Sequence, residues 1–390
     1  MPSPLPPVRA LTLGLAGRHP LDAEALAWGA ELLRSASGAV AGAGYEVQTL
    51  RLSSRPLLAD MPGCSQVELD GYLGWLQDEL DRLGVAFMSL GPVGAVPAQL
   101  ARVPELAAML APRPALNWSV MVAEAGGRLD VAAAEQAGRA MALLAGADEE
   151  GLGNFRFAAT ACVRPGTPFF PAAYHDGPPA LSVALQGAGV LALALGGGAS
   201  LGEVSARVAQ QVEQSAAPVV ELCRAVCGEA GAAFAGVDLS PAPGPGASVV
   251  AALEEAGLGP FGGPGTLALC AAVTSGLQST SLPTCGYCGL MLPVMEDPVL
   301  AGRWEEGRVG LDQLLTYSAV CGTGLDTVPV PGGTSPSDLA RVVADMASLA
   351  VRYSKPLSAR LMPVPGASPG QLSRFSSPYL VNTVVKPVSG

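Results

Sequence analysis

Short apolar runs and segments with helical spacing alternate along almost the whole chain, and this alternation limits the possible folds more than any other feature. Residues 8–15, 85–90 and 116–122 have the length and composition of buried strands. Residues 67–83 and 131–145 repeat apolar side chains with the period of an amphipathic helix. Strands that alternate with helices are joined by crossovers, so we predict a mostly parallel sheet covered by helices.

The same pattern predicts roughly ten strands in one continuous series. The predicted strands are residues 8–15, 45–52, 85–90, 116–122, 155–163, 182–188, 233–239, 325–330, 357–364 and 379–385. The predicted helices begin at Asp22 and at residues 67, 97, 131, 200, 247, 311 and 336. The turn-rich segment 241–246 is too short to separate domains, so we expect a single domain, residues 1–390, with an α/β fold.

Composition excludes several classes of partner. Hydrophobic residues make up 49% of the sequence and charged residues 14%, which suits a large buried core and argues against disorder. The net charge of −11, with no cluster of Lys and Arg, disfavours a nucleic-acid or anionic membrane surface. Aromatic residues amount to 5%, which argues against platforms for base stacking. We therefore expect a small-molecule partner.

Cysteine usage and the first residues predict a cytoplasmic location. The eight cysteines lack the spacing of a secreted disulfide framework, and the first residues lack the features of a signal peptide. The apolar run at residues 181–195 is interrupted by glycine and falls short of the ~20 residues that a membrane-spanning helix needs. We expect free thiols in a reducing compartment and no membrane contact.

Two glycine-flanked thiol segments are the first candidates for chemistry. Cys285 and Cys288 form a CxxC pair before Gly289, and Cys321 opens a second Gly-rich stretch. Glycine lets the backbone approach a ligand, and a thiol there can act as a nucleophile. Zinc would need further ligands at suitable spacing, and a disulfide-exchange motif should open a helix. Buried, inert thiols are the alternative.

Charged and polar side chains in or after apolar strands are the second set of candidates. Arg156 and Arg360 lie within apolar strands, where they could clamp a carboxylate or phosphate or form internal ion pairs. Asp238 and Ser240 end another strand, where they could act on a ligand, hold a metal or cap local backbone donors. His175 could transfer protons near neutral pH or serve as a polar loop residue.

Two further segments have the composition of helix starts. Glu296 and Asp297 precede a proline and could begin a helix, and Thr334 or Ser335 could cap the helix at residue 336. The amides near residue 335 could also hold an anion. The lysine of a P-loop is missing there, and no GxGxxG follows the first strand, so nucleotide and dinucleotide folds are disfavoured.

Several motifs, in order along the chain, resemble those of the family catalogued as domain of unknown function 711. These motifs are residues 154–157, 168–175, 285–287, 289–294, 324–329, 355–360 and 377–382. The resemblance implies a barrel similar to that of pyruvate formate-lyase, with ten strands in two five-stranded halves and loops inside. It also implies a homodimer and assigns no reaction. Gly390 is the last residue, whereas the radical glycine of such enzymes is internal, so we expect chemistry without a glycyl radical.

We therefore predict a ten-stranded α/β barrel of the pyruvate formate-lyase-like type that holds a small anionic metabolite. The leading hypothesis is an enzyme or enzyme-like protein without a cofactor. The predicted catalytic residues are Cys285, Cys321, Asp238, Asp326 and His175, and the predicted substrate-binding residues are Arg156, Arg360, Ser240, Thr327 and Asn382. One alternative is a non-catalytic metabolite-binding or regulatory protein. The other is a divalent-metal enzyme that uses His175, Asp238, Glu296 or Asp326.

Overall fold

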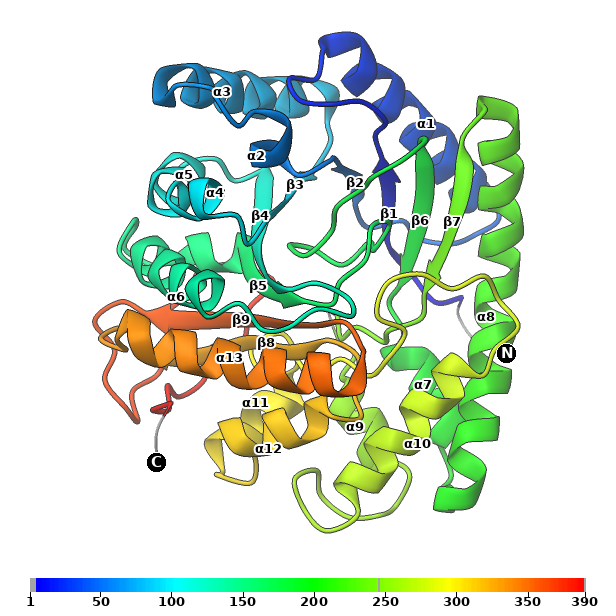
Figure 1. Cartoon of the computed structure of the whole chain (residues 1–390). Helices are drawn as coiled ribbons and strands as arrows, with labels where there is room; N and C mark the ends of the chain where they lie inside the picture. The colour runs from blue at the N-terminus through cyan, green and yellow to red at the C-terminus, as the bar shows by residue number, and fades with distance from the viewer. Residues whose placement is uncertain (1–4, 245, 389–390) are drawn as a thin grey trace.

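One sheet of nine strands organises residues 5–244 and 246–388, the parts of the chain that the computed structural model describes. The strands are β1 (Val8–Gly14), β2 (Leu50–Ser53), β3 (Phe87–Val93), β4 (Leu116–Ala123), β5 (Phe157–Ala161), β6 (Ala180–Leu185), β7 (Ala233–Asp238), β8 (Gly324–Pro331) and β9 (Leu357–Val364). Their order in the sheet is β7-β6-β1-β2-β3-β4-β5-β9-β8. Figure 1 shows that the sheet curls around a central region through which loops run, with the helices outside.

Strand directions divide the sheet into two groups. Strands β1 to β5 are parallel to one another, β6 is parallel to β7, and β8 is parallel to β9. The junctions β1–β6 and β5–β9 are antiparallel. The amino ends of β1 to β5 therefore share one rim with the carboxyl ends of β6 to β9. At this rim, which we call the site rim, Val8 of β1 pairs with Leu185 of β6.

The helices form the outer layer because each has one apolar side. In α3, for example, Leu69, Leu73, Leu76 and Leu80 are buried at the predicted spacing. The helices are α1 (Ala23–Gly42), α2 (Leu57–Asp60), α3 (Gln66–Leu83), α4 (Pro97–Leu100), α5 (Val103–Leu110), α6 (Val131–Ala145), the 3-10 helix η1 (Leu152–Arg156), α7 (Ala188–Leu195), α8 (Leu201–Ala230), α9 (Val249–Glu254), α10 (Thr266–Gln278), α11 (Pro298–Glu305), α12 (Leu311–Ser318) and α13 (Pro336–Tyr353). None of these helices is long and apolar enough to cross a membrane, among the residues described.

The helix-covered α/β architecture is confirmed, but the predicted ten strands are corrected to nine. In the described chain β7 and β8 do not pair with each other. Residues 284–294 lie between them and make one parallel bridge to β7, from Thr284 to Val237, and one to β8, from Pro293 to Asp326. This segment is not a strand because Gly286 and Cys288 adopt positive φ angles of 72° and 43°, which interrupt extended backbone.

The predicted last strand, residues 379–385, is also corrected. Its backbone makes only an isolated bridge between Leu372 and Val384. Its polar groups bond instead to scattered partners: Val381 N donates to Met295 O at 2.6 Å, and Trp304 Nε1 donates to Val384 O at 2.8 Å. The segment is thus fixed by contacts to Met295, to Trp304 of α11 and to residues 371–373 instead of by a strand partner.

Predicted helix caps are confirmed, and one of them connects two helices. The side chains of Asp22 and Ser335 accept hydrogen bonds from the first turns of α1 and α13. Asp297 caps α11 as predicted, and its carboxylate also accepts from Val249 N and Val250 N at the start of α9, at 2.7 and 3.1 Å. Asp297 is only 1% exposed. Helices α9 and α11 are thus capped by one carboxylate.

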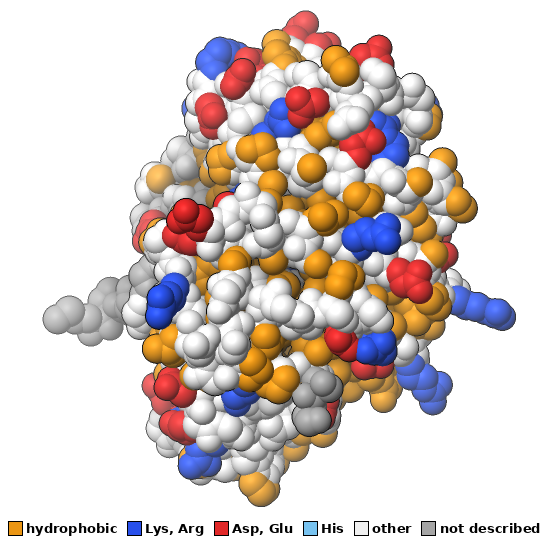
Figure 2. All heavy atoms as spheres, turned by 90° about the vertical axis from the view of Figure 1, so that its left-hand side faces the viewer, with side chains coloured by type: hydrophobic (Ala, Val, Ile, Leu, Met, Phe, Trp, Pro, Cys, Tyr) orange, Lys and Arg blue, Asp and Glu red, His pale blue; other side chains and the backbone are white. Residues whose placement is uncertain are grey.

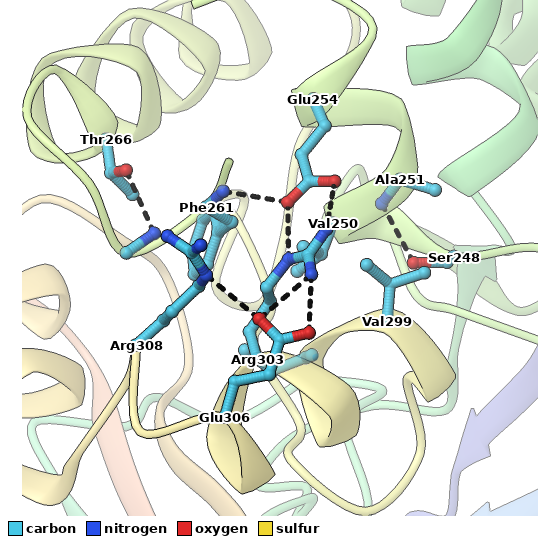
Figure 3. Close-up of polar contacts among 12 residues, drawn as sticks. Ser248, Val250, Ala251, Glu254, Phe261, Thr266, Val299, Arg303, Glu306 and Arg308 are labelled. Carbon is cyan, nitrogen blue, oxygen red and sulfur yellow. Dashed lines mark hydrogen bonds and ion pairs between the residues drawn. The ribbon is translucent and has the colours of Figure 1, made fainter. Parts of the chain in front are cut away.

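An ion-pair network joins the same two helices on their outer side (Figure 3). The Arg303 guanidinium contacts both oxygens of Glu254 at 2.8 and 2.9 Å and also contacts Glu306. Arg308 contacts Glu306 at 2.9 Å, and Phe261 N donates to Glu254 at 2.7 Å. Every charge in this network has a partner, so the network explains local structure and does not suggest a ligand site.

Gly390, on which the expectation of chemistry without a glycyl radical rests, lies outside the described residues, as do residues 1–4.

Candidate functional site

A buried cluster of charged side chains lies at the site rim, on the inner side of the curled sheet. Arg360 of β9 contacts Asp326 of β8 at 2.6 Å and Glu296 at 2.5 Å, and Glu296 also contacts Arg9 of β1 at 3.0 Å. Arg360 is 3% exposed. Burial alone would lower the pKa of Arg360, but the carboxylates of Asp326 and Glu296 outweigh it and raise that pKa. Arg360 is therefore held in an internal ion pair.

Arg51 of β2 lies next to this cluster, but its charge has no carboxylate partner in the described chain. Its Nε donates to Thr49 Oγ1 at 2.9 Å, and its guanidinium lies between the rings of Phe170 and Phe87, at 5.1 and 5.7 Å from their centroids. Burial and the nearby Arg9 lower the pKa of Arg51 to about 9, and Glu296 acts in the opposite direction. Arg9 Nη1 is likewise buried without a hydrogen-bond partner among the described residues.

A cavity of about 20 Å³ opens beside these two arginines. A space of this size holds about one water molecule. The strand ends contribute Arg9, Arg51, Ala184, Leu185, Asp238 and Ser240, and the loops contribute Pro168, Phe169, Phe170, Ala242 and Met291. Cationic and acidic side chains therefore share a small and mostly apolar space.

Asp238 holds the CxxC segment against the end of β7. Its Oδ1 accepts from Ser240 N, Ser240 Oγ and Cys288 N at 2.9, 2.6 and 3.1 Å, and its Oδ2 accepts from Tyr287 N at 3.0 Å. Burial raises the pKa of Asp238, and these hydrogen bonds oppose that rise. Gly286 is required here because a Cβ on it would lie 2.2 Å from Asp238 Oδ2. Asp238 and Ser240 thus have the backbone-capping role considered above, and they also line the cavity.

The CxxC thiols are neutral near pH 7. Burial, then Asp238, then Cys288 raise the pKa of Cys285 well above its ordinary value. Burial also raises the pKa of Cys288 to about 12, and Asp238 adds to the effect. Both thiols are free. Because the thiolate is the reactive form, this environment does not activate either cysteine as a nucleophile.

Cys321 lies away from the cavity, where two backbone segments cross. Gly322 N donates to Leu290 O at 3.0 Å, and a Cβ on Gly289 would lie 2.4 Å from the Cα of Gly322. The carbonyl of buried Cys321 accepts from Lys355 Nζ. The glycines beside the cysteines thus allow two parts of the chain to approach each other, rather than a ligand.

The side chains of two predicted site residues do not join the cluster. Arg156 points to the outer helices, where its Nη2 donates to Ala111 O at 2.7 Å. His175 packs against Gly14 at the carboxyl end of β1, and its Nε2 lies 2.7 Å from Pro178 O. Gly14 lies five residues further along β1 than Arg9, roughly 17 Å at the rise of a strand. Neither residue lines the cavity, which is bordered by Arg9, Arg51 and Asp238.

The last two predicted substrate-binding residues support neighbouring backbone. Thr327 Oγ1 accepts from Met295 N at 3.3 Å, next to Glu296. Asn382 holds a turn, because its Oδ1 accepts from Ser373 Oγ and Phe375 N at 2.9 and 2.8 Å. Thr327 therefore helps to position Glu296, whereas Asn382 stabilises the C-terminal loop.

The side chains suggested for a divalent metal do not converge. Within residues 5–244 and 246–388, no group of three or more His, Cys, Asp or Glu side chains is arranged to hold a metal ion. Glu296 and Asp326 both face Arg360, Asp238 is bonded to backbone amides, and His175 is at the other rim. The described donor set does not fit a metal centre.

Arg9 and Arg51 are the site residues that the sequence analysis did not select. Both carry the signal that selected Arg156 and Arg360, an arginine within a predicted apolar strand. Tyr287, buried beside the CxxC thiols, was also not selected, and its hydroxyl has no partner in the described chain. The missing information was the direction in which each side chain points.

Fold and site together define an α/β protein with a charged interior at one rim of a curled sheet. The chain belongs to the family described as uncharacterised ACR (DUF711), whose model matches residues 7–376. The resemblance found in the motifs is thereby confirmed.

Several curated relatives are named UPF0210 proteins. One from Pyrobaculum arsenaticum is 38% identical over 238 residues, which cover 57% of this chain and 52% of the relative. One from Pyrobaculum aerophilum is 40% identical over 229 residues, 55% of this chain and 50% of the relative. One from Listeria monocytogenes is 32% identical over 257 residues, 63% and 56% of the two chains. The chain spans about half the length of the curated relatives it matches.

One solved structure is broadly similar. The crystal structure of the anaerobic ribonucleotide reductase from Thermotoga maritima, in complex with dATP and CTP, matches with a TM-score of 0.45 and 9% sequence identity. The match covers 90% of this chain and 75% of that chain. A likeness at this level supports no conclusion about activity.

Proposed function

We propose that this protein binds a small organic anion inside the ring of strands, at the cavity beside Arg9 and Arg51. The observation that carries the proposal is the unneutralised charge of Arg51. The cluster holds three guanidinium groups, Arg9, Arg51 and Arg360, but the two carboxylates of Glu296 and Asp326 contact only Arg9 and Arg360. Arg51 is partly buried, and a charge in such a position without a carboxylate partner still costs free energy, which an anionic ligand would relieve.

The proposal changes which arginines hold the anion. Arg360 is occupied by two carboxylates and Arg156 faces the outer helices, so neither is free to clamp a ligand. Arg51 and the unpaired Nη1 of Arg9 line the cavity instead. Since the cavity of about 20 Å³ holds only a water molecule, ligand binding requires the cavity to enlarge.

Calorimetric titration of the full chain with acetate, propionate and pyruvate, in a buffer without small anions, tests the proposal. Replacement Arg51→Met should weaken binding by about 10- to 100-fold, because a hydrogen bond to a charged group contributes about 1.5–3 kcal/mol. Arg156→Met is the matched control: it removes a buried arginine on the other side of the sheet and should leave the affinity unchanged. Equal affinities in the wild type and Arg51→Met would contradict the proposal.

Turnover of the bound anion is the second candidate function. It is favoured by the Tyr287 hydroxyl and Asp326 Oδ2, which are buried without hydrogen-bond partners among the described residues. Buried polar groups are nearly always paired, so these two have hydrogen-bonding capacity left for water or a substrate, although neither lines the cavity in this structure. If the protein is an enzyme that uses Tyr287, Tyr287→Phe should abolish product formation and leave anion affinity nearly unchanged. A wild-type protein that binds an anion but leaves it unaltered would instead be a metabolite-binding protein.

A further inference from the structure

The cavity has an acidic wall as well as a basic one. Asp238 lines it together with Arg9 and Arg51, yet no ion pair joins Asp238 to either arginine in the described chain. Oδ2 of Asp238 accepts one hydrogen bond, from Tyr287 N, whereas a carboxylate oxygen can accept two. An anion and a cation that lack ionic partners therefore border the same small space.

We infer that the ligand of this cavity is a short zwitterion, an amino acid or a close analogue, whose carboxylate meets Arg9 and Arg51 and whose ammonium group meets Asp238. This inference rests on the proposed anion site. A simple carboxylate would neutralise only the basic wall, and its apolar end would be placed against a buried charge. A zwitterion supplies a partner to both walls, and each charge-assisted hydrogen bond that it makes favours it over the simple acid.

The other lining residues define the rest of the ligand. Leu185, Ala242 and Met291 are apolar, and Phe169 and Phe170 add aromatic surface. The groups between the two charges and any side chain should therefore be small and hydrocarbon-like, without further charges. Because Phe170 also lies over Arg51, outward movement of this ring would enlarge the cavity and expose the guanidinium at the same time.

Calorimetric titration of the wild-type full chain with matched ligands tests the inference. L-Alanine is compared with L-lactate and propionate, and L-norvaline with valerate, so that each set keeps its carbon skeleton and changes only the ammonium group. We expect the amino acid to bind about 10-fold or more tightly than the simple acid of its set, with lactate between them. Equal affinities within both sets would overturn the zwitterion but leave the anion site intact. Binding of none of these ligands would overturn the anion site together with this inference.

The variant Asp238→Asn tests whether Asp238 causes the preference for an amino acid. It removes the charge and keeps an oxygen that can accept from Ser240 and Cys288. In this variant the preference for alanine over propionate should fall to about twofold or less. An undiminished preference in a folded Asp238→Asn protein would overturn the role of Asp238. If the variant does not fold, the wild-type comparison still decides the ligand class, since it needs no mutation.

Discussion

Arg51 and Arg360 differ in whether a carboxylate compensates their charge, and this difference predicts opposite effects on stability. Arg360→Met leaves Asp326 and Glu296 buried and facing each other, so the free energy of unfolding should fall by about 3–5 kcal/mol. Arg51→Met removes a charge without a partner and its repulsion with Arg9, so that free energy should be unchanged or higher. Urea denaturation of the ligand-free proteins measures both. A large loss of stability in Arg51→Met would mean that the charge is compensated.

His19 is a buried titratable side chain at the rim opposite to the site rim. His19 is 4% exposed; its Nδ1 is 2.8 Å from Tyr72 Oη, and its Nε2 is 2.8 Å from Ser54 Oγ. Nε2 also lies 3.2 Å from Arg55 O, and a carbonyl oxygen can only accept, so the neutral imidazole carries its proton on Nε2 and its Nδ1 accepts from the Tyr72 hydroxyl. Every group in this network is paired when the imidazole is neutral. Burial lowers the pKa of His19 from 6.5 to about 4.

His19 should therefore make the protein less stable in acid. Between pH 6.5 and 4 the unfolded chain binds a proton at His19 and the folded chain does not. The contribution of His19 is thus fully present above pH 6.5 and is lost progressively as the pH falls towards 4, by at most about 3 kcal/mol. Denaturation of wild type and His19→Gln across pH 4–8 checks this. Their difference in unfolding free energy should be constant above pH 7 and should shrink below pH 6.5. If the difference in unfolding free energy stayed constant from pH 8 to pH 4, the lowered pKa of His19 would be contradicted.

For single residues, the sequence did not determine the direction in which the side chain points. Arg360 lies within β9, and Asp326 and Arg9 also lie in strands whose inward positions face the cluster. Arg156 precedes its strand, in the 3-10 helix η1, so the alternation of β5 does not fix where it points. The same residue type in a similar apolar context therefore contacts Asp326 in one case and the backbone of α5 in the other.

Among the helices, Asp297 offers the sharpest test, because one side chain caps both α9 and α11. Asp297→Ala removes the cap of α11 and leaves Val249 N and Val250 N at the start of α9 unpaired, so the free energy of unfolding should fall by about 2–4 kcal/mol. Asp22→Ala, which removes a single exposed cap from α1, is the control and should cost about 1 kcal/mol. Thermal or urea denaturation compares the two. If both variants lost a similar free energy of unfolding, Asp297 would contribute no more than the cap of a single helix.

Elements with a clear period were predicted well, and elements fixed by distant contacts were not. The strands and helices up to residue 145 follow the 2.0 and 3.6 periods of their buried positions, and the structure places elements there. Residues 284–294 and 379–385 lack such a period, because single bridges and hydrogen bonds to Asp238, Ser240 and Met295 set their positions. Local pattern cannot reveal partners that lie so far away in the sequence.

At the scale of the whole molecule, we expect the backbone amides of the sector between β7 and β8, residues 284–294, to be less protected from exchange than those of the paired strands. Its amides bond largely to side chains: Tyr287 N and Cys288 N to Asp238, Gly289 N to Ser240, and Leu290 N to Thr274. Hydrogen exchange followed by mass spectrometry should find residues 285–292 exchanging faster than β1, which is paired on both sides. Equal protection of these two regions would show that the sector opens only when the sheet unfolds.

The incomplete pairing of β7 with β8 also bears on the speed of ligand uptake. Met291 belongs to that sector and lines the cavity, so a local fluctuation there can admit a molecule while every ladder of the sheet stays intact. Association would then be gated: its observed rate would level off at high ligand concentration, at the rate at which the sector opens. Proline or glycine substitutions in residues 284–294 should change the rates at which the proposed ligand enters and leaves, without altering the charged side chains proposed to bind it.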